Sequence, residues 1–87
     1  MNTIEDVKAD LAQRIAQAMY MRVEEIGEDV PFSDFGLESV TLLRILEGIS
    51  STYKCTITIP ELMDHQTLSA AAHFIYRRIE DQAGVRS

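Results

Sequence analysis

The chain has 87 residues, of which 14 are acidic and 8 are basic, so its formal net charge is −6. A chain of this length can bury one core, which excludes a second layer or a deep enclosed cleft, and we expect one domain over residues 1–87. The acidic balance excludes the basic surface that nucleic-acid binding requires. It suits docking onto basic patches of partner proteins, or it serves only to keep a small protein soluble.

The cellular setting follows from the single cysteine and from the N-terminus. Cys55 cannot form a disulfide within the chain or a thiolate metal cluster, which is typical of the reducing cytoplasm. The N-terminus is acidic where a signal peptide is basic, and no segment reaches membrane-spanning length. Met1 lies close to the first predicted helix, which favours a discrete protein over an excised module. We therefore expect a cytoplasmic monomer with no membrane segment.

Apolar residues recur at three- and four-residue steps from Ile4 to Met19, which predicts a helix over about residues 3–21. Thr3 followed by Asp6 resembles a capping box, the reciprocal pairing of side chains and backbone N–H groups at a helix start. Residues 22–38 interrupt the helical pattern with Gly27, Pro31 and Gly36. Because this stretch also holds many apolar side chains, it predicts a long ordered loop packed on the core.

A second helix is predicted from Glu38 or Ser39 to about Tyr53. Its apolar stripe is broad, which indicates contact with more than one neighbour or an apolar strip left for a partner. One row comprises Leu42, Leu46, Ile49 and Tyr53, and Val40, Leu43 and Ile45 widen it.

Residues 54–59 alternate like a strand, but a lone strand has no pairing partner, so we expect an extended connector that buries Ile57 and Ile59. Pro60 can open a short third helix, and Thr67 is a suitable N-cap for the last helix. We expect residues 83–87 to form a frayed tail. Three long helices and one short helix predict an all-α, four-helix bundle with a long structured loop between the first two helices.

The sequence contains no recognisable catalytic or metal-binding constellation. His65 and His73 have no ligand partner at metal-binding spacing and are expected at the surface. Cys55 lies in an apolar connector, where a buried, inert thiol is expected. We therefore predict no catalytic residue, no metal site and no enzymatic activity.

The remaining feature is the segment from Phe35 to Val40, in which a glycine precedes a serine at the start of the second helix. On its own, this pattern is explained by Ser39 acting as a helix N-cap. Gly36 would supply a turn with positive φ that clears space around Ser39. Leu37 and Val40 would either anchor the segment to the core or contact a modifying enzyme.

In its wider context, this segment resembles the attachment motif of the acyl carrier protein family. The stretch reads PFSDFGLESVTLLRILEGIS, and the resemblance extends to the first helix, to residues 29–32 and to residues 57–60. The family's usual motif is Gly-x-Asp-Ser-Leu. Gly36 and Ser39 match it, whereas Glu38 replaces the Asp and Val40 replaces the Leu.

The resemblance implies that Ser39 carries 4′-phosphopantetheine, with Gly36, Leu37, Glu38 and Val40 as the motif around it. The arm holds acyl groups as thioesters, and a phosphopantetheinyl transferase attaches it. Further partners would be a ketosynthase, an acyltransferase or other acyl-modifying enzymes. They would dock on the second helix, for which the exposed candidates are Glu38, Leu42 or Leu43, Arg44 and Glu47.

Within the family, the local sequence is most similar to carriers of polyketide synthases, or of hybrid polyketide and nonribosomal peptide systems. It lacks the strongly acidic second helix of fatty-acid carriers, and it lacks the second glycine that is usual before the serine of peptidyl carriers. Those two carrier types remain alternatives. From another class, a non-carrier helical adaptor would keep the fold and use Ser39 only as an N-cap.

Overall fold

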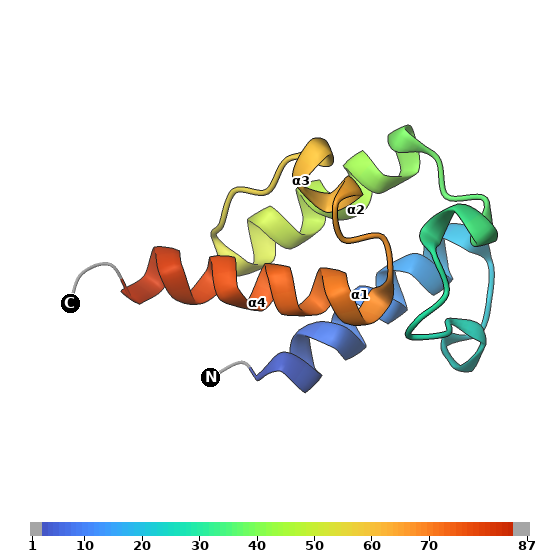
Figure 1. The fold of residues 1–87 in the computed structure, drawn as a ribbon, viewed down its shortest axis with the longest axis horizontal. Coiled ribbons are helices and arrows are strands. Elements are labelled where there is room, and N and C mark those ends of the chain that lie inside the picture. Colours follow the sequence, from blue (N-terminus) through green and yellow to red (C-terminus); the bar gives the residue numbers. More distant parts are fainter. Residues whose placement is uncertain (1–2, 85–87) are drawn as a thin grey trace.

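The computed structural model describes residues 3–84 and folds them into four α-helices (Figure 1). These are α1 (Ile4–Met19), α2 (Ser39–Tyr53), the short α3 (Ile59–Met63) and α4 (Leu68–Gly84). Two short 3₁₀ helices, η1 (Val23–Glu25) and η2 (Phe32–Phe35), lie in the loop between α1 and α2. The described residues contain no β-strand, so the predicted all-α bundle with one short helix is confirmed.

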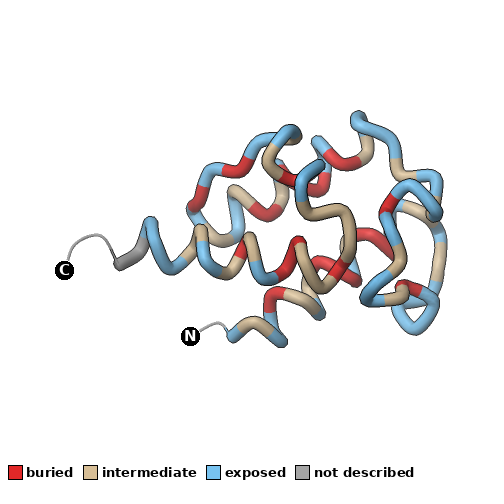
Figure 2. Tube along the Cα trace, in the orientation of Figure 1, coloured by how far each residue is buried: buried red, intermediate tan, exposed pale blue. Residues whose placement is uncertain are grey.

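The long helices pack with α4 alongside α1, and α2 contacts both α1 and α3. The buried residues lie along the parts of these helices that face one another (Figure 2). Burying a large aliphatic side chain contributes about 1.5–3 kcal/mol, so this cluster supplies the main driving force for folding. Its largest fully buried members are Val7, Leu11, Ile15, Ile49, Leu62 and Ile75. No helix of the described part of the chain has the length and apolar character needed to cross a membrane.

The helix boundaries follow from local chemistry. The capping box at Thr3 is confirmed, because the Thr3 hydroxyl accepts from the Asp6 N–H and the Asp6 carboxylate accepts from the Thr3 N–H, each at 3.1 Å. The first helix ends at Met19, earlier than predicted, because Tyr20 adopts the left-handed conformation with φ of 57°. Helix α4 continues through Gly84, and the frayed tail expected over residues 83–87 stays a prediction. Residues 85–87 lie outside the described residues.

The loop between α1 and α2 is ordered, as predicted, and it covers one end of the bundle (Figure 1). Ile26 and Phe32 insert into the core and are 6% and 3% exposed. The backbone N–H of Phe32 donates to the Gln66 carbonyl at 2.7 Å, and the N–H of Ser69 donates to the Glu28 carbonyl at 3.0 Å. Buried side chains and backbone bonds to the start of α4 therefore hold the loop in place.

The connector after α2 matches its prediction in part. Cys55 and Ile57 are buried as expected, but Ile59 is only partly buried and is already the first residue of α3. Burial raises the pKa of the Cys55 thiol, which keeps it protonated and inert. Thr67 caps α4, because its hydroxyl accepts from the Ala70 N–H at 3.1 Å. The expected buried thiol and N-cap are both confirmed.

A polar network ties α1 to α2. The Tyr53 hydroxyl donates to Asp10 Oδ2 at 2.5 Å, and Arg14 bonds both Asp10 and the Thr52 hydroxyl, at 3.0 and 2.9 Å. Burial, followed by the hydrogen bond to Asp10, raises the pKa of Tyr53 to about 12. A Cβ at Gly48 would overlap the end of the Arg14 side chain, so a larger residue there would require the guanidinium to shift.

We predict that Tyr53→Phe lowers the free energy of unfolding by about 1 kcal/mol, since it leaves Asp10 without one charge-assisted hydrogen bond. Urea unfolding of the two proteins measures the difference. Tyr20→Phe is the matched control, because the Tyr20 side chain is 97% exposed and the substitution should leave stability unchanged. Equal stability of the two variants would contradict a structural role for the network.

A second polar link joins α3 to α4. Arg78 Nη2 donates to Glu61 Oε2 at 2.6 Å, and the Thr58 N–H donates to Glu61 Oε1 at 3.0 Å. The hydrogen bond from Arg78, followed by that from the Thr58 backbone, lowers the pKa of Glu61 to about 2. The ordinary pKa of an unfolded glutamate is about 4.3. The stabilisation by ionised Glu61 is therefore present above pH 4.3 and is lost as the pH falls toward 2.

We predict that the melting temperature of the wild-type protein falls between about pH 4.5 and pH 2.5 more steeply than that of Glu61→Gln. The two proteins should differ most near neutral pH and converge in acid. Thermal unfolding followed by circular dichroism across this range measures both slopes. Parallel curves would show that Glu61 titrates in the folded protein as it does in the unfolded chain.

Candidate functional site

The turn that leads into α2 depends on Gly36. This residue ends η2 with φ of 77° and ψ of 20°, which confirms the predicted positive-φ turn. A Cβ at this position would meet no atom within 4 Å, so the requirement for glycine is conformational and not a matter of space. The Gly36 N–H donates to the Ser33 carbonyl at 3.1 Å, and the Leu37 N–H donates to the Phe32 carbonyl at 3.3 Å. The turn is thus bonded to the anchored part of the loop.

Ser39 is the first residue of α2, and it is exposed. The N-cap is Glu38, which has extended backbone angles and whose carbonyl accepts the first helical hydrogen bond, from the Leu42 N–H at 2.9 Å. Ser39 therefore does not cap the helix, and the N-cap explanation that the sequence left open is wrong. Within residues 3–84, the Ser39 hydroxyl makes no hydrogen bond. The fold places this hydroxyl at the surface without using it.

The start of α2 is electrostatically suited to an anion. The N–H groups of Ser39, Val40 and Thr41 precede the first helical donor, Leu42, and so have no partner within the helix. They also lie at the positive end of the helix dipole. A phosphate group attached at this position would gain from both effects.

The side chains around Ser39 divide into anchors and exposed groups. Leu37 is half-buried and packs against the core, whereas Val40 is 68% exposed. Of the two roles left open for these residues, Leu37 is thus the anchor and Val40 is available to a partner. Leu43 is 47% exposed, but Leu42 is only 4% exposed, so the prediction that Leu42 lies on a docking face is wrong. The helical period turns its side chain toward the core.

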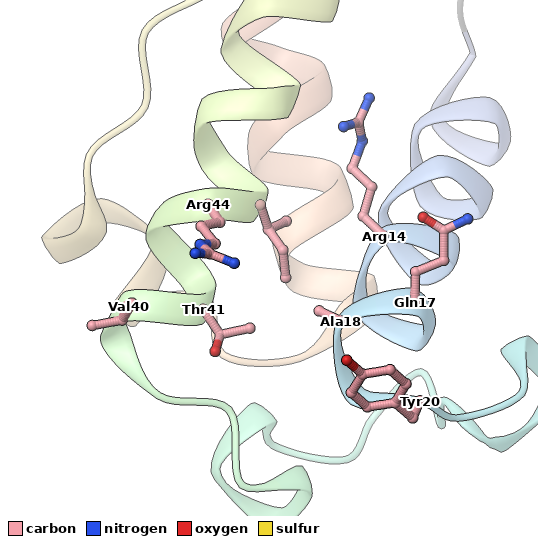
Figure 3. A pocket seen from close by; sticks show the side chains of 8 residues that line it. Arg14, Gln17, Ala18, Tyr20, Val40, Thr41 and Arg44 are labelled. Atoms are coloured by element: carbon pink, nitrogen blue, oxygen red, sulfur yellow. The ribbon is translucent and has the colours of Figure 1, made fainter.

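Helices α1 and α2 border an open groove of about 440 Å³ (Figure 3). Val40, Thr41 and Arg44 line it from α2, and Gln17 and Tyr20 line it from the end of α1. The Val40 side chain points away from α1 and lies at the edge of the groove (Figure 3). The sequence did not identify this groove. Its residues are too far apart along the chain to form a motif, and the left-handed backbone at Tyr20 carries no recognisable signal.

The two histidines lie near each other on α4 and the turn before it, and both line a second surface pocket. The His65 ring stacks on Phe74 with centroids 4.6 Å apart, and His73 Nδ1 lies 3.0 Å from the Ser69 carbonyl oxygen. No cluster of three or more His, Cys, Asp or Glu side chains in residues 3–84 is arranged to hold a metal ion.

Comparison with known proteins is consistent with this geometry. The family model described as "Phosphopantetheine attachment site" matches residues 9–75. The acyl carrier protein TtuC of Teredinibacter turnerae is 30% identical over 73 residues, which is 84% of this chain and 84% of TtuC. The solved structure titled as the HMG-ACPI domain from the CurA module of Lyngbya majuscula superposes with a TM-score of 0.81. It has 30% sequence identity and covers 93% of this chain and 82% of that chain.

A much larger protein also matches. Polyketide synthase PksL of Bacillus subtilis is 28% identical over 82 residues, which is 94% of this chain but 2% of PksL. The chain therefore corresponds to one small part of that synthase. Members of the matched family carry phosphopantetheine and, as carrier domains, are generally not catalytic. This chain belongs to the phosphopantetheine attachment site family and is a carrier protein related to the acyl carrier domains of polyketide synthases.

Proposed function

We propose that this protein carries acyl intermediates of polyketide biosynthesis as thioesters on a 4′-phosphopantetheine arm attached to Ser39. The observation that carries the proposal is the position of the Ser39 hydroxyl, which is exposed, free of hydrogen bonds within residues 3–84, and located at the first position of α2. The arm supplies a terminal thiol that forms the thioester. The protein's own contribution is to present Ser39, and catalysis belongs to its partner enzymes.

Attachment requires an accessible hydroxyl and not an adjacent base on the carrier. A phosphopantetheinyl transferase would catalyse attack of the Ser39 oxygen on the phosphorus of coenzyme A that bears the pantetheine. The new O–P bond forms as the pyrophosphate bond breaks, 3′,5′-ADP leaves, and the hydroxyl proton is released. The unpaired N–H groups at the start of α2 favour the resulting phosphodiester anion.

We predict that incubation with coenzyme A and a broad-specificity transferase adds the mass of one phosphopantetheine to the protein. Ser39→Ala should abolish this gain, and Ser33→Ala, which removes the exposed serine six residues earlier, should retain it. Because Ser39 caps nothing, its substitution should change the free energy of unfolding by less than about 0.5 kcal/mol. Intact-protein mass spectrometry and urea unfolding provide the two readouts.

Failure to gain mass with several transferases would contradict the carrier function and favour a helical adaptor that only binds proteins. Unfolding of Ser39→Ala would instead make Ser39 a structural residue.

The proposed docking surface for partner enzymes consists of the exposed side chains of α2 near Ser39. Glu38, Leu43, Arg44 and Glu47 are all exposed, and Leu43 and Glu47 share one face at a spacing of four residues. An apolar side chain flanked by acids suits an apolar patch with a basic rim on the partner. The partners would be the transferase and a ketosynthase, an acyltransferase or other acyl-modifying enzymes.

We predict that Leu43→Ser lowers kcat/KM of a cognate ketosynthase for the loaded carrier by about fivefold, the equivalent of about 1 kcal/mol. Val23→Ser is the matched control, since Val23 is similarly exposed, at 42% against 47%, but lies in η1 and not on α2. The control should leave kcat/KM unchanged. Equal kinetics for the two variants would remove Leu43 from the docking surface.

A further inference from the structure

The groove between α1 and α2 carries a charge opposite to that of the chain. The whole sequence has 14 acidic residues against 8 basic ones. Of the described side chains that line the groove, two are arginines, Arg14 and Arg44, and none is acidic. A concave, cationic surface on an acidic protein favours an anionic ligand over a cationic one.

The two arginines differ in how far their charge is already neutralised. Arg14 pairs with Asp10 at 3.0 Å and also bonds the Thr52 hydroxyl. Arg44 is exposed and makes no ion pair within the part of the chain that the structure describes. Its guanidinium is therefore the free charge of the groove, and it can bind a carboxylate with two parallel hydrogen bonds.

The groove begins beside the proposed attachment point. Val40 and Thr41, which line it, follow Ser39 directly in the first turn of α2 (Figure 3). A group tethered to Ser39 reaches this groove by folding back over the start of α2. The tether also keeps the local concentration of such a group high, so weak contacts suffice to hold it.

The remaining lining is mixed, and most of it is polar. Val40 adds an apolar side chain and Tyr20 an aromatic ring that is 97% exposed, whereas Ile45 is only 5% exposed. At about 440 Å³, the groove falls in the size range of small-ligand sites, although it is open to solvent. A small, mostly polar groove with one free guanidinium suits a short chain that ends in an anion better than a long hydrocarbon chain.

We infer that this groove binds acyl cargo that ends in a carboxylate, the half-thioester of a short dicarboxylic acid, with Arg44 pairing the carboxylate. This inference rests on the proposed attachment of the arm to Ser39. Acyl groups of the same length without the carboxylate gain nothing from Arg44. The groove thereby distinguishes carboxylated from simple acyl cargo on the carrier itself.

The test compares succinyl and butyryl cargo, two four-carbon chains of which only succinyl bears a free carboxylate. The transferase loads each from its coenzyme A thioester, and the free succinyl carboxyl carries a ¹³C label. We expect its pKa, followed by ¹³C NMR, to be lower by about 0.5 in the wild-type protein than in Arg44→Gln. Arg77→Gln removes an exposed arginine of α4 outside the groove and should match the wild type.

A second readout is the set of backbone amide shifts. Succinyl and butyryl forms should differ at Gln17, Thr41 and Arg44 in the wild-type protein, and this difference should disappear in Arg44→Gln. Identical succinyl pKa values in Arg44→Gln and Arg77→Gln would overturn the inference.

Two other outcomes would be equally clear. If Arg44→Gln leaves the succinyl pKa unchanged but slows transfer to a partner enzyme, the groove binds an acidic side chain of that enzyme and the inference is wrong. If the chain accepts no acyl-phosphopantetheine at all, the proposed function fails and the inference fails with it. Loading is read directly from the protein mass, so the two failures are distinguishable.

Discussion

The insertion of Phe32 into the core is the contact on which the arrangement around Ser39 depends. Its side chain is 3% exposed, and its N–H bonds the Gln66 carbonyl just before α4. These contacts hold the middle of a long loop that otherwise has little regular structure. Because the Phe32 carbonyl also accepts from the Leu37 N–H, the turn at Gly36 starts from a fixed point. The beginning of α2 is positioned by the core, although Ser39 itself contributes nothing to it.

The residues that stabilise the fold are different from the residues around Ser39, which leaves the start of α2 free for function. The hydrogen bonds and buried side chains that stabilise the protein lie elsewhere: in the Tyr53–Asp10–Arg14 network, in the Glu61–Arg78 pair and in the aliphatic core. The first turn of α2 has an unbonded serine hydroxyl and a 68% exposed valine. A covalent group added at this point would displace no structural contact, which is what a carrier requires of its attachment site.

The amino-acid sequence predicted most of the fold, because the apolar period of each long helix and the capping residues Thr3 and Thr67 are local signals. It also predicted the positive φ at Gly36. It did not predict that α1 ends at Tyr20, since a left-handed tyrosine is set by the surrounding structure and not by its own preference.

The candidate site was predicted less completely than the fold. Leu42 and Leu43 are adjacent and both apolar, and only the helix phase shows that the first is buried and the second exposed. Glu38, and not Ser39, proved to be the N-cap, because an extended residue with a non-bonding side chain can take that place. The groove beside Ser39 joins residues at the end of α1 and on α2 that are 20 or more positions apart, so no local pattern could reveal it.

Fragmentation of the modified protein tests the central claim, that the fold presents Ser39 for modification. After loading, trypsin should release a peptide spanning residues 23–44, which contains Ser33 and Ser39 as its only serines. We predict that tandem mass spectrometry places phosphopantetheine on Ser39 in every modified molecule. Modification of Ser33, or of a serine outside this peptide, would contradict it.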